Sequence, residues 1–352
     1  MQAALKLLLE PIFEADFQPV SYGFRPKRRA HDAIAEIHFW TSRSYEWVLE
    51  GDITACFDEI SHVGLMDRLR ARVGDKRVLG LVKSFLKAGI LSGDGVERDT
   101  ITGTPQGGIL SPLLANIALS VLDEHFAAAW TAMGGSSARH RLRAKGLPTY
   151  RVVRFAEDFV VLVSGTQAHA EDLREETAAV LAPMGLRLSE TKTKVAHIDE
   201  GFDFLGFRIQ RRRKRGSGKR FVYTYPSKKA LAAILDKVRA LTRRSAHRTL
   251  ATLLCRLNSV LRGWCNYFKY GVSKATFGYL DAFAWRRVVR WLHRRHFGLS
   301  WDALRRRYLP GWRPTEDGVT LFDCRAVVVS RYRYRGGRIP SPWPSDTTGA
   351  VA

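Results

Sequence analysis

The residues of this 352-residue chain best suited to chemistry are acids at the ends of short apolar segments. Glu157 and Asp158 stand between two apolar runs, Tyr150–Phe155 and Phe159–Ser164, a pattern typical of a β-hairpin with acids in its turn. Asp52 ends another apolar run farther upstream. Hard divalent cations prefer oxygen ligands, and acids on neighbouring strand ends suit two-metal phosphoryl transfer. We therefore expect these three acids to meet at one metal site.

Asp52 alone is a weak signal, because a salt-bridged Asp at a strand end is commoner than a metal ligand. The segment from Gly103 to Asn116, Gly-Thr-Pro-Gln-Gly-Gly followed by an apolar stretch, is more specific. Its glycines let the backbone approach a ligand closely. The segment also opens a predicted helix, whose N-terminal amides suit phosphate. An ordinary turn before a helix would not require Gln106 and Asn116.

Positive charge is concentrated in the second part of the chain. Residues 207–352 hold 33 Lys and Arg against 7 Asp and Glu, which leaves 24 and 27 for residues 1–206. A near-neutral first part fused to a strongly basic second part indicates a polyanionic partner, most often nucleic acid. The alternatives are a role in solubility or attraction to a membrane surface.

The sequence gives no sign of export or of a membrane span. Its apolar runs are too short to cross a bilayer, and residues 1–10 resemble an amphipathic helix more than a signal peptide. The four cysteines form no C-x-x-C pair, which argues against a zinc site and a disulfide framework. We expect a cytoplasmic protein that does not contact a membrane.

The elements that must position the acids alternate between strands and helices. Trp47–Phe57 is predicted to contain the Asp52 strand, and a helix is predicted to follow the Gly-rich segment. After the acidic hairpin we expect a helix, three short strands and the charge block 211–220, then a set of helices that carry cationic and aromatic residues together. These elements are predicted at Ala168–Met184, Leu186–Leu188, Lys194–Ile198 and Phe202–Gln210, and at 227–242, 247–270 and 275–297.

Six blocks, in this order, resemble the reverse transcriptase/maturase encoded by bacterial group II introns. Residues Leu257–Phe268 resemble the thumb and maturase domain of that family, and the resemblance extends over about residues 1–335. The six blocks are the Tyr22–Pro26 loop, the Asp52 strand, the Pro105-Gln106-Gly107 turn, the acidic hairpin, Lys192-Thr193-Lys194 and Phe204-Leu205-Gly206-Phe207.

The resemblance implies an α+β fold of the right-hand polymerase type. Fingers and a palm with an antiparallel sheet would be followed by an α-helical thumb and maturase domain. The expected boundaries are residues 1–210 for fingers and palm, 211–225 for a basic linker or hairpin, 226–335 for the helical RNA-binding domain and 336–352 for a disordered tail.

The resemblance also implies a role for particular residues. Asp52, Glu157 and Asp158 would be catalytic and, with the backbone carbonyl of Ile53, would hold two Mg²⁺ ions, with Mn²⁺ as the alternative metal. Nucleotide-binding residues would be Arg25 at the triphosphate, Phe57 as the gate against a 2′-hydroxyl, Gln106 beside the sugar and template base, and Lys194 near the triphosphate. Residues that bind primer or RNA would be Phe204, Leu205, Gly206, Arg262, Trp264 and Tyr267.

Several of these residues have a purely structural alternative. Phe57 could be a core side chain, and Lys194 a solvated lysine at a strand end. The Phe204–Phe207 segment could equally be an apolar strand of the core.

The expected activity is that of an RNA-directed DNA polymerase, a nucleotidyltransferase that also assists intron splicing and mobility. Its partners would be intron RNA, an RNA template, a DNA primer and deoxynucleoside triphosphates. Two departures from the family pattern keep alternatives open. Phe155-Ala156-Glu157-Asp158 stands where the family has Tyr-Ala-Asp-Asp, and Met1 falls inside an early family block, so the fingers look truncated. The alternatives are a weakened or decayed RNA-binding maturase and a relative recruited to phage defence or DNA repair.

Overall fold

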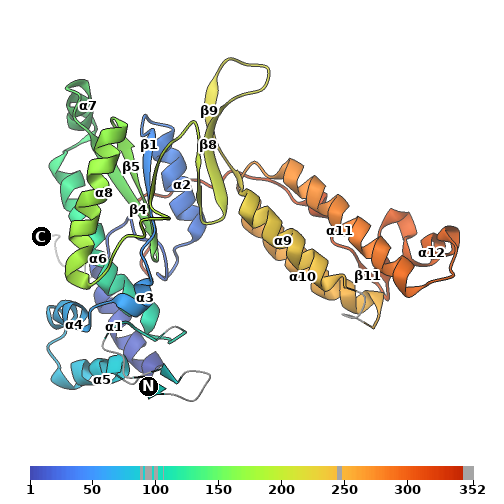
Figure 1. The fold of residues 1–352 in the computed structure, drawn as a ribbon, viewed down its shortest axis with the longest axis horizontal. Helices are drawn as coiled ribbons and strands as arrows, with labels where there is room; N and C mark the ends of the chain where they lie inside the picture. Colours follow the sequence, from blue (N-terminus) through green and yellow to red (C-terminus); the bar gives the residue numbers. More distant parts are fainter. Residues whose placement is uncertain (88–89, 92–96, 99–101, 106, 244–247, 344–352) are drawn as a thin grey trace, which may run out of the picture. The chain divides into compact units, whose positions relative to one another are not determined.

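The computed structural model describes residues 1–87, 90–91, 97–98, 102–105, 107–243 and 248–343. The chain divides into two compact units (Figure 1). The first comprises Met1–Phe202 and the residues from Arg333 onward, and the second comprises Asp203–Tyr332. The first unit thus ends before residue 210, the boundary expected from sequence. The chain enters this unit again after the second unit.

A four-stranded sheet forms the centre of the first unit, with strand order β4-β5-β1-β6. Its neighbouring strands are antiparallel, as expected of the palm. β5 is buried from Phe159 to Ser164, and such a run of buried residues indicates a strand covered on both faces. The strands are β1 (Trp47–Gly51), β4 (Thr149–Phe155), β5 (Asp158–Ser164) and β6 (Lys194–His197).

Helices cover both faces of this sheet (Figure 1). Helices α6 (Ser111–Ala132) and α8 (Gln167–Leu181) pack on one face, and α2 (Ala30–Thr41) packs against β4 and β5 on the other. The long buried side of α6 includes the polar residues Asn116 and Asp123. These two polar side chains lie on a buried helix side that is mostly apolar.

One close contact fixes the register next to the acids. The ring of Phe159 lies against Gly51, its partner across β1 and β5. A Cβ atom on Gly51 would lie 2.0 Å from Phe159 Cζ. Since no side chain fits there, glycine is required at the residue before Asp52.

Short helices and strands complete the first unit. Helix α1 begins at Gln2 and buries Leu5, Leu9 and Phe13, which share one face because they are four residues apart. The remaining elements are α1 (Gln2–Asp16), α3 (Cys56–Glu59), α4 (His62–Arg70), α5 (Lys76–Lys87), β2 (Ile90–Leu91), β3 (Glu97–Arg98), α7 (Ser136–Ala144) and η1 (Ala182–Met184).

The second unit combines a three-stranded sheet with amphipathic helices. Helix α10 buries residues at helical spacing from Leu250 to Phe268, as expected for one face against a core. The elements of the second unit are β7 (Phe202–Phe204), β8 (Phe207–Arg213), β9 (Arg220–Pro226), α9 (Lys228–Leu241), α10 (Leu250–Phe268), α11 (Lys274–Arg295), α12 (Trp301–Tyr308), η2 (Pro310–Trp312), β10 (Thr315–Glu316), β11 (Val319–Thr320) and η3 (Cys324–Ala326).

The basic charge block forms the end of a regular β-hairpin. β8 and β9 pair without interruption from Phe207 opposite Pro226 to Arg213 opposite Arg220. Arg213 and Arg220 therefore lie opposite each other at the last residue pair of the hairpin, where their like charges repel. The backbone closes the tip, because Lys214 N–H donates to Lys219 O at 2.9 Å.

The end of the chain returns to the first unit. Arg335 donates through Nε and Nη2 to both carboxylate oxygens of Asp32 on α2, each at 2.7 Å. The neighbouring Tyr334 ring packs on Phe39 of the same helix, with ring centroids 4.8 Å apart. Residues 333–335 thus belong with α2 and not with the helical unit where we expected them. The predicted disorder of the tail concerns residues 336–343, which the structure describes, and 344–352, which lie outside the described residues.

Within the part of the chain that the structure describes, we find no helix with the length and apolar character needed to cross a bilayer.

Candidate active site

The strand register brings Asp52 and Asp158 to the same end of the sheet. Gly51 is paired with Phe159, so the next positions on the two strands, Asp52 and Asp158, follow side by side. Phe155 pairs with Asp158 and closes the β4–β5 hairpin. Glu157 therefore lies in the two-residue turn immediately before Asp158.

The turn has an unusual backbone that its neighbours hold in place. Ala156 has a φ of 56°, in the left-handed region that costs a residue with a side chain about 1–2 kcal/mol. Gly23 lies directly against this turn, and a Cβ atom there would come within 2.1 Å of Ala156 N. The Ala156 carbonyl accepts a hydrogen bond of 2.8 Å from Arg154 Nη1.

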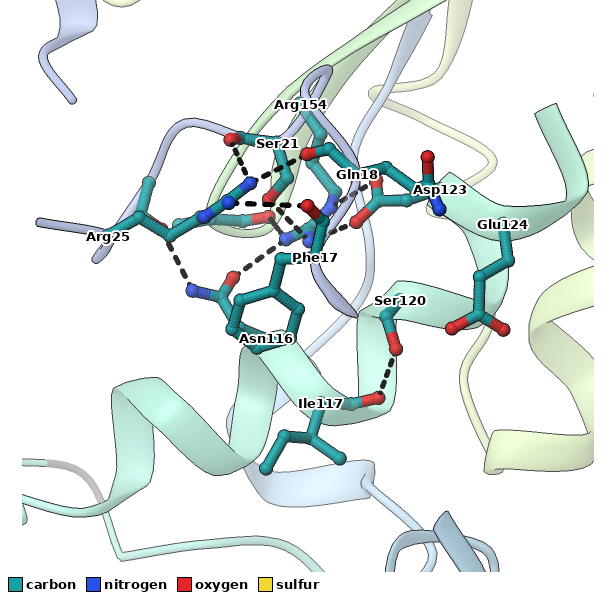
Figure 2. A network of polar contacts seen from close by, with 12 residues as sticks. Phe17, Gln18, Ser21, Arg25, Asn116, Ile117, Ser120, Asp123, Glu124 and Arg154 are labelled. Carbon is teal, nitrogen blue, oxygen red and sulfur yellow. Dashed lines mark hydrogen bonds and ion pairs between the residues drawn. The ribbon is translucent and has the colours of Figure 1, made fainter. Parts of the chain in front are cut away.

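Arg154 is the centre of a buried polar network (Figure 2). Its side chain is fully buried, and it forms a two-pronged ion pair with the equally buried Asp123 on α6. Nη1 also donates to Asn116 Oδ1 at 3.0 Å, and Nη2 donates to Ser21 Oγ at 2.7 Å. With Ala156, these contacts occupy every N–H donor of the guanidinium.

Glu157 has a buried carboxylate oxygen without a partner. Its Oε2 atom accepts no hydrogen bond among the described residues. Burial raises the pKa of the Cys56 thiol to about 12, and the nearby Glu157 carboxylate adds to that rise. An unpaired buried carboxylate oxygen is costly, so a cation or another donor is expected beside it.

Asp52 is held by a lysine to which sequence reasoning gave no role. Lys192 Nζ lies 3.2 Å from Asp52 Oδ1, and the Asp52 side chain is 32% exposed. The backbone carbonyl of Asp52 accepts from Ser189 N at 2.8 Å, which ties the acid to the segment that carries the lysine. Lys192 belongs to the Lys192-Thr193-Lys194 block of the family pattern, from which a nucleotide-binding role is expected only for Lys194.

The donor set fits a divalent cation in part. Carboxylates and a backbone carbonyl are the oxygen ligands that Mg²⁺ and related ions prefer, and the unpartnered Glu157 oxygen is suited to such an ion. Yet no group of three or more His, Cys, Asp or Glu side chains is close enough to form a metal cluster in the described residues. The acids are gathered at one end of the sheet without converging on one point.

The predicted nucleotide-binding residues have different surroundings. The Phe57 ring is half-buried and meets Phe24 edge to face at 6.4 Å between centroids. The Phe57 carbonyl accepts from Thr104 N at 2.6 Å, which ties the Gly-rich segment to α3. Lys194 is exposed on β6, opposite Glu50. Gln106 lies outside the described residues.

Arg25 has a structural role within its loop. Its guanidinium donates five hydrogen bonds, to both carboxylate oxygens of Glu14 and to the carbonyls of Phe17, Gln18 and Ser21. These contacts use all of its donors. The expectation of a triphosphate contact at Arg25 conflicts with this arrangement, which leaves no donor for a ligand.

Most of the predicted primer- and RNA-binding residues pack together in the second unit. Tyr267 donates through its hydroxyl to Leu205 O at 2.9 Å, and burial raises its pKa to about 12. Gly206 lies against Phe268, while Phe204 is buried. The Trp264 ring packs on Phe268 at 4.5 Å between centroids. Arg262 differs from the others, because it is exposed and lies over the Phe322 ring.

Comparison with known proteins connects both units to one kind of protein. Residues 1–209 match the family model of reverse transcriptases, described as RNA-dependent DNA polymerases. Residues 231–309 match the group II intron maturase-specific domain. The chain belongs to the group II intron reverse transcriptase/maturase family. As a member of this reverse transcriptase family, it has the predicted fold class, with an antiparallel palm sheet followed by a helical domain.

Curated relatives of this chain are found in bacteria and fungi. Protein YkfC of Escherichia coli is 38% identical over 68% of this chain and 69% of its own length. The group II intron-encoded protein LtrA of Lactococcus lactis is 32% identical over 81% of this chain and 58% of its own. An uncharacterised 91 kDa protein in the cob intron of Schizosaccharomyces pombe is 29% identical over 79% of this chain and 41% of its own. This chain therefore spans little more than half of LtrA.

Proposed function

We propose that this chain is an RNA-directed DNA polymerase that uses divalent cations and assists group II intron splicing and mobility. The observation that carries the proposal is the side-by-side placement of Asp52 and Asp158 across β1 and β5, with an unpartnered Glu157 oxygen in the adjoining turn. Buried carboxylate oxygens without donors are costly unless a ligand satisfies them.

Asp52, Glu157 and Asp158, with the Ile53 carbonyl, would hold two Mg²⁺ ions. Bound there, such ions would lower the pKa of a primer 3′-hydroxyl and neutralise charge on the leaving pyrophosphate. The protein's own contribution is position. Asp158 would be held at the start of β5 and Asp52 directly after the end of β1, and the hydrogen-bonded hairpin turn would hold Glu157.

Phe57 and Gln106 would contact the incoming deoxynucleotide, with Lys194 near its triphosphate. Phe57 is suited to a steric gate because its ring is only half-buried, while its backbone is anchored to Thr104. A rigid anchor would let the ring exclude a 2′-hydroxyl through its shape alone.

The second unit would bind the primer end and structured intron RNA. The Phe204–Gly206 turn would contact the primer strand. Tyr267 and Phe268 pack against this turn and would hold it in place. The exposed cations of the β8–β9 hairpin and Arg262 would contact phosphates, which dominate the affinity for nucleic acids.

The direct test is Mg²⁺-dependent extension of a DNA primer on an RNA template by the purified chain. Asp52→Asn serves as the inactive control, because it keeps the size of the side chain and removes its charge. Extension by the parent that is lost in Asp52→Asn supports the proposal. A correctly folded parent that extends no primer with either Mg²⁺ or Mn²⁺ refutes it.

A second candidate function is RNA binding without polymerisation, as in a maturase whose catalytic site has decayed. Glu157 favours it, because the family has Asp at this position and the longer side chain places its oxygens one methylene farther out than the tight geometry of Mg²⁺ suits. Splicing assistance and tight binding of intron RNA by the Asp52→Asn variant, with an inactive parent polymerase, would select this function.

A further inference from the structure

Three segments that are distant in sequence meet at the Arg154 side chain. They are the Val20–Gly23 loop, helix α6 and the turn of the acidic hairpin (Figure 2). We propose that Arg154 is a positioning residue, which sets the place of the Glu157 carboxylate by holding the hairpin turn against α6. This inference rests on the proposed polymerase function and names a residue on which that function depends.

The link from Arg154 to the acid is short. Arg154 Nη1 donates at once to Asn116 Oδ1 on α6 and to the carbonyl of Ala156, the residue before Glu157. The Asn116 amide in turn donates to Gly23 O at 2.8 Å. Gly23 fits against Ala156 N with no room for a side chain. The turn is therefore hydrogen-bonded to Arg154 through the Ala156 carbonyl and packed against Gly23 at the Ala156 nitrogen.

The backbone adds a second tie between the same segments. Arg154 N donates to Val20 O, and Tyr22 N donates to Arg154 O, each at 2.9 Å. The loop thus runs along β4 like a short extra strand. A shift of the Arg154 side chain would have to disturb the loop, the helix and the turn together.

Only arginine can make this arrangement. Its planar guanidinium directs five donors in fixed directions, and the contacts with Asp123, Asn116, Ser21 and Ala156 use all of them. A lysine has three donors on one nitrogen. It could pair with Asp123 but could not reach the Ala156 carbonyl and Asn116 from the same place.

Stability alone does not explain a buried ion pair at this site. Removal of two charges from water costs several kcal/mol per ion, and well-packed apolar residues of similar volume are often equally stable. Both Arg154 and Asp123 are fully buried. The charged pair provides a directed N–H donor, Arg154 Nη1, for the carbonyl of Ala156 in the strained turn. An apolar pair would provide no such donor.

The first experiment compares Arg154→Lys with Ser21→Ala in primer extension at varied Mg²⁺ and Mn²⁺. Ser21→Ala removes one hydrogen bond from Arg154 but leaves the bond to Ala156 intact, so it is the matched control. We expect Arg154→Lys to lower kcat about 10- to 100-fold, since a shift of about 1 Å in a reacting group has that effect. The KM for primer–template should change less than twofold, and Ser21→Ala should keep kcat within twofold. An unchanged kcat in Arg154→Lys overturns the inference.

The second experiment uses the double variant Arg154→Met/Asp123→Leu, which replaces both charges with apolar side chains of similar size and should fold even if Arg154→Lys does not. Amide hydrogen exchange is measured for the hairpin turn and, as an internal reference, for the centre of α8. Faster exchange at the turn with unchanged exchange in α8 supports the inference. Equal protection of the turn in parent and double variant overturns it, whether or not the parent polymerises. If the parent shows no extension but the turn of the double variant exchanges faster than that of the parent, the positioning role stands and only the proposed activity fails.

Discussion

Lys192 Nζ and Asp52 Oδ1 lie 3.2 Å apart, so one acid of the candidate site already has a cationic partner. The lysine side chain is itself 68% exposed, and such surface pairs contribute about 0–1 kcal/mol. A metal ion bound at Asp52, as proposed, would therefore displace the lysine at little cost, and the two cations would compete for the same oxygen.

This competition predicts that Lys192→Met binds divalent ions more tightly in the absence of nucleotide. The expected gain is about two- to fivefold in affinity, because less than about 1 kcal/mol opposes the ion in the parent. Titration with Mn²⁺, followed by electron paramagnetic resonance, measures it. Lys83→Met on α5 removes one exposed charge elsewhere in the first unit and should leave the affinity unchanged. Equal affinity in Lys192→Met and parent would contradict the expectation.

The length of the Glu157 side chain predicts a second result. Mg²⁺ demands a near-ideal octahedral arrangement, and Glu places its oxygens one methylene farther out than Asp. We expect Glu157→Asp to raise kcat with Mg²⁺ about tenfold and to change kcat with Mn²⁺ less. Glu157→Gln should abolish extension with both ions. Equal kcat with Mg²⁺ in Glu157→Asp and the parent would show that the longer Glu157 side chain does not slow the reaction.

Gly23 predicts a steric effect on the acidic turn. In Gly23→Ala the new methyl group would meet backbone atoms of Ala156, which cannot rotate away. We expect a loss of about 1–3 kcal/mol in the free energy of unfolding, as for overpacked sites, and a larger proportional loss of activity. Urea denaturation and primer extension measure the two. Gly80→Ala on α5, where a methyl group meets open space, should leave activity unchanged and raise stability by up to about 1 kcal/mol.

Buried protonated groups predict a loss of stability at alkaline pH. Burial raises the pKa of Cys56 from 9.0 to about 12 and that of Tyr267 from 10.0 to about 12. The folded state keeps these protons longer than the unfolded state, so their contribution is complete below pH 9 and is lost as the pH rises toward 12. Urea unfolding between pH 7 and pH 11 measures this decline. Cys56→Ala and Tyr267→Phe should each make it shallower, and an unchanged slope in both would contradict the assignment.

The β8–β9 hairpin predicts a salt-dependent contribution to RNA binding. The variant with Arg213, Lys214, Arg215 and Lys219 changed to Ser removes four exposed cations at its tip. If each neutralises one phosphate, the slope of log K against log salt should fall by about 3. A filter-binding titration at several salt concentrations checks this. Ser replacement of four exposed cations on α5 and α9, Lys83, Lys87, Lys228 and Lys229, is the control and should change the slope less.

The β4–β5 hairpin with Glu157 in its turn could be predicted from sequence because it depends on local pattern. Apolar runs of strand length with an acid-bearing turn between them indicate an antiparallel hairpin, whereas the pairing of β1 with β5 joins residues that are distant in sequence. The contrast between a near-neutral first part and a basic second part also follows from charge alone.

The identity of the buried cations could not be predicted in this way. Arg25 and Arg154 are both buried, yet sequence reasoning gave Arg25 to a ligand and gave Arg154 no role. An arginine beside acids looks the same whether it faces solvent or the core. The partners of Arg154 lie 31 and 38 residues away on α6, and only the packing of that helix on the sheet reveals them.

The contact of Lys192 with Asp52 could not be predicted for a related reason. Lys192 and Lys194 are two residues apart, and which of them reaches Asp52 depends on where β6 begins. Strand ends are the least predictable part of an element. The return of Arg335 to Asp32 on α2 was equally invisible, because it joins residues 303 positions apart.

The contact between Gly51 and Phe159 has a consequence for how this protein can evolve. Any side chain at position 51 would collide with the Phe159 ring, so a larger residue there is tolerated only after position 159 has become smaller. The two changes are acceptable in one order and harmful in the other. Since each position adjoins an acid, Asp52 or Asp158, a lineage that takes the wrong order loses the geometry of the site without altering either acid.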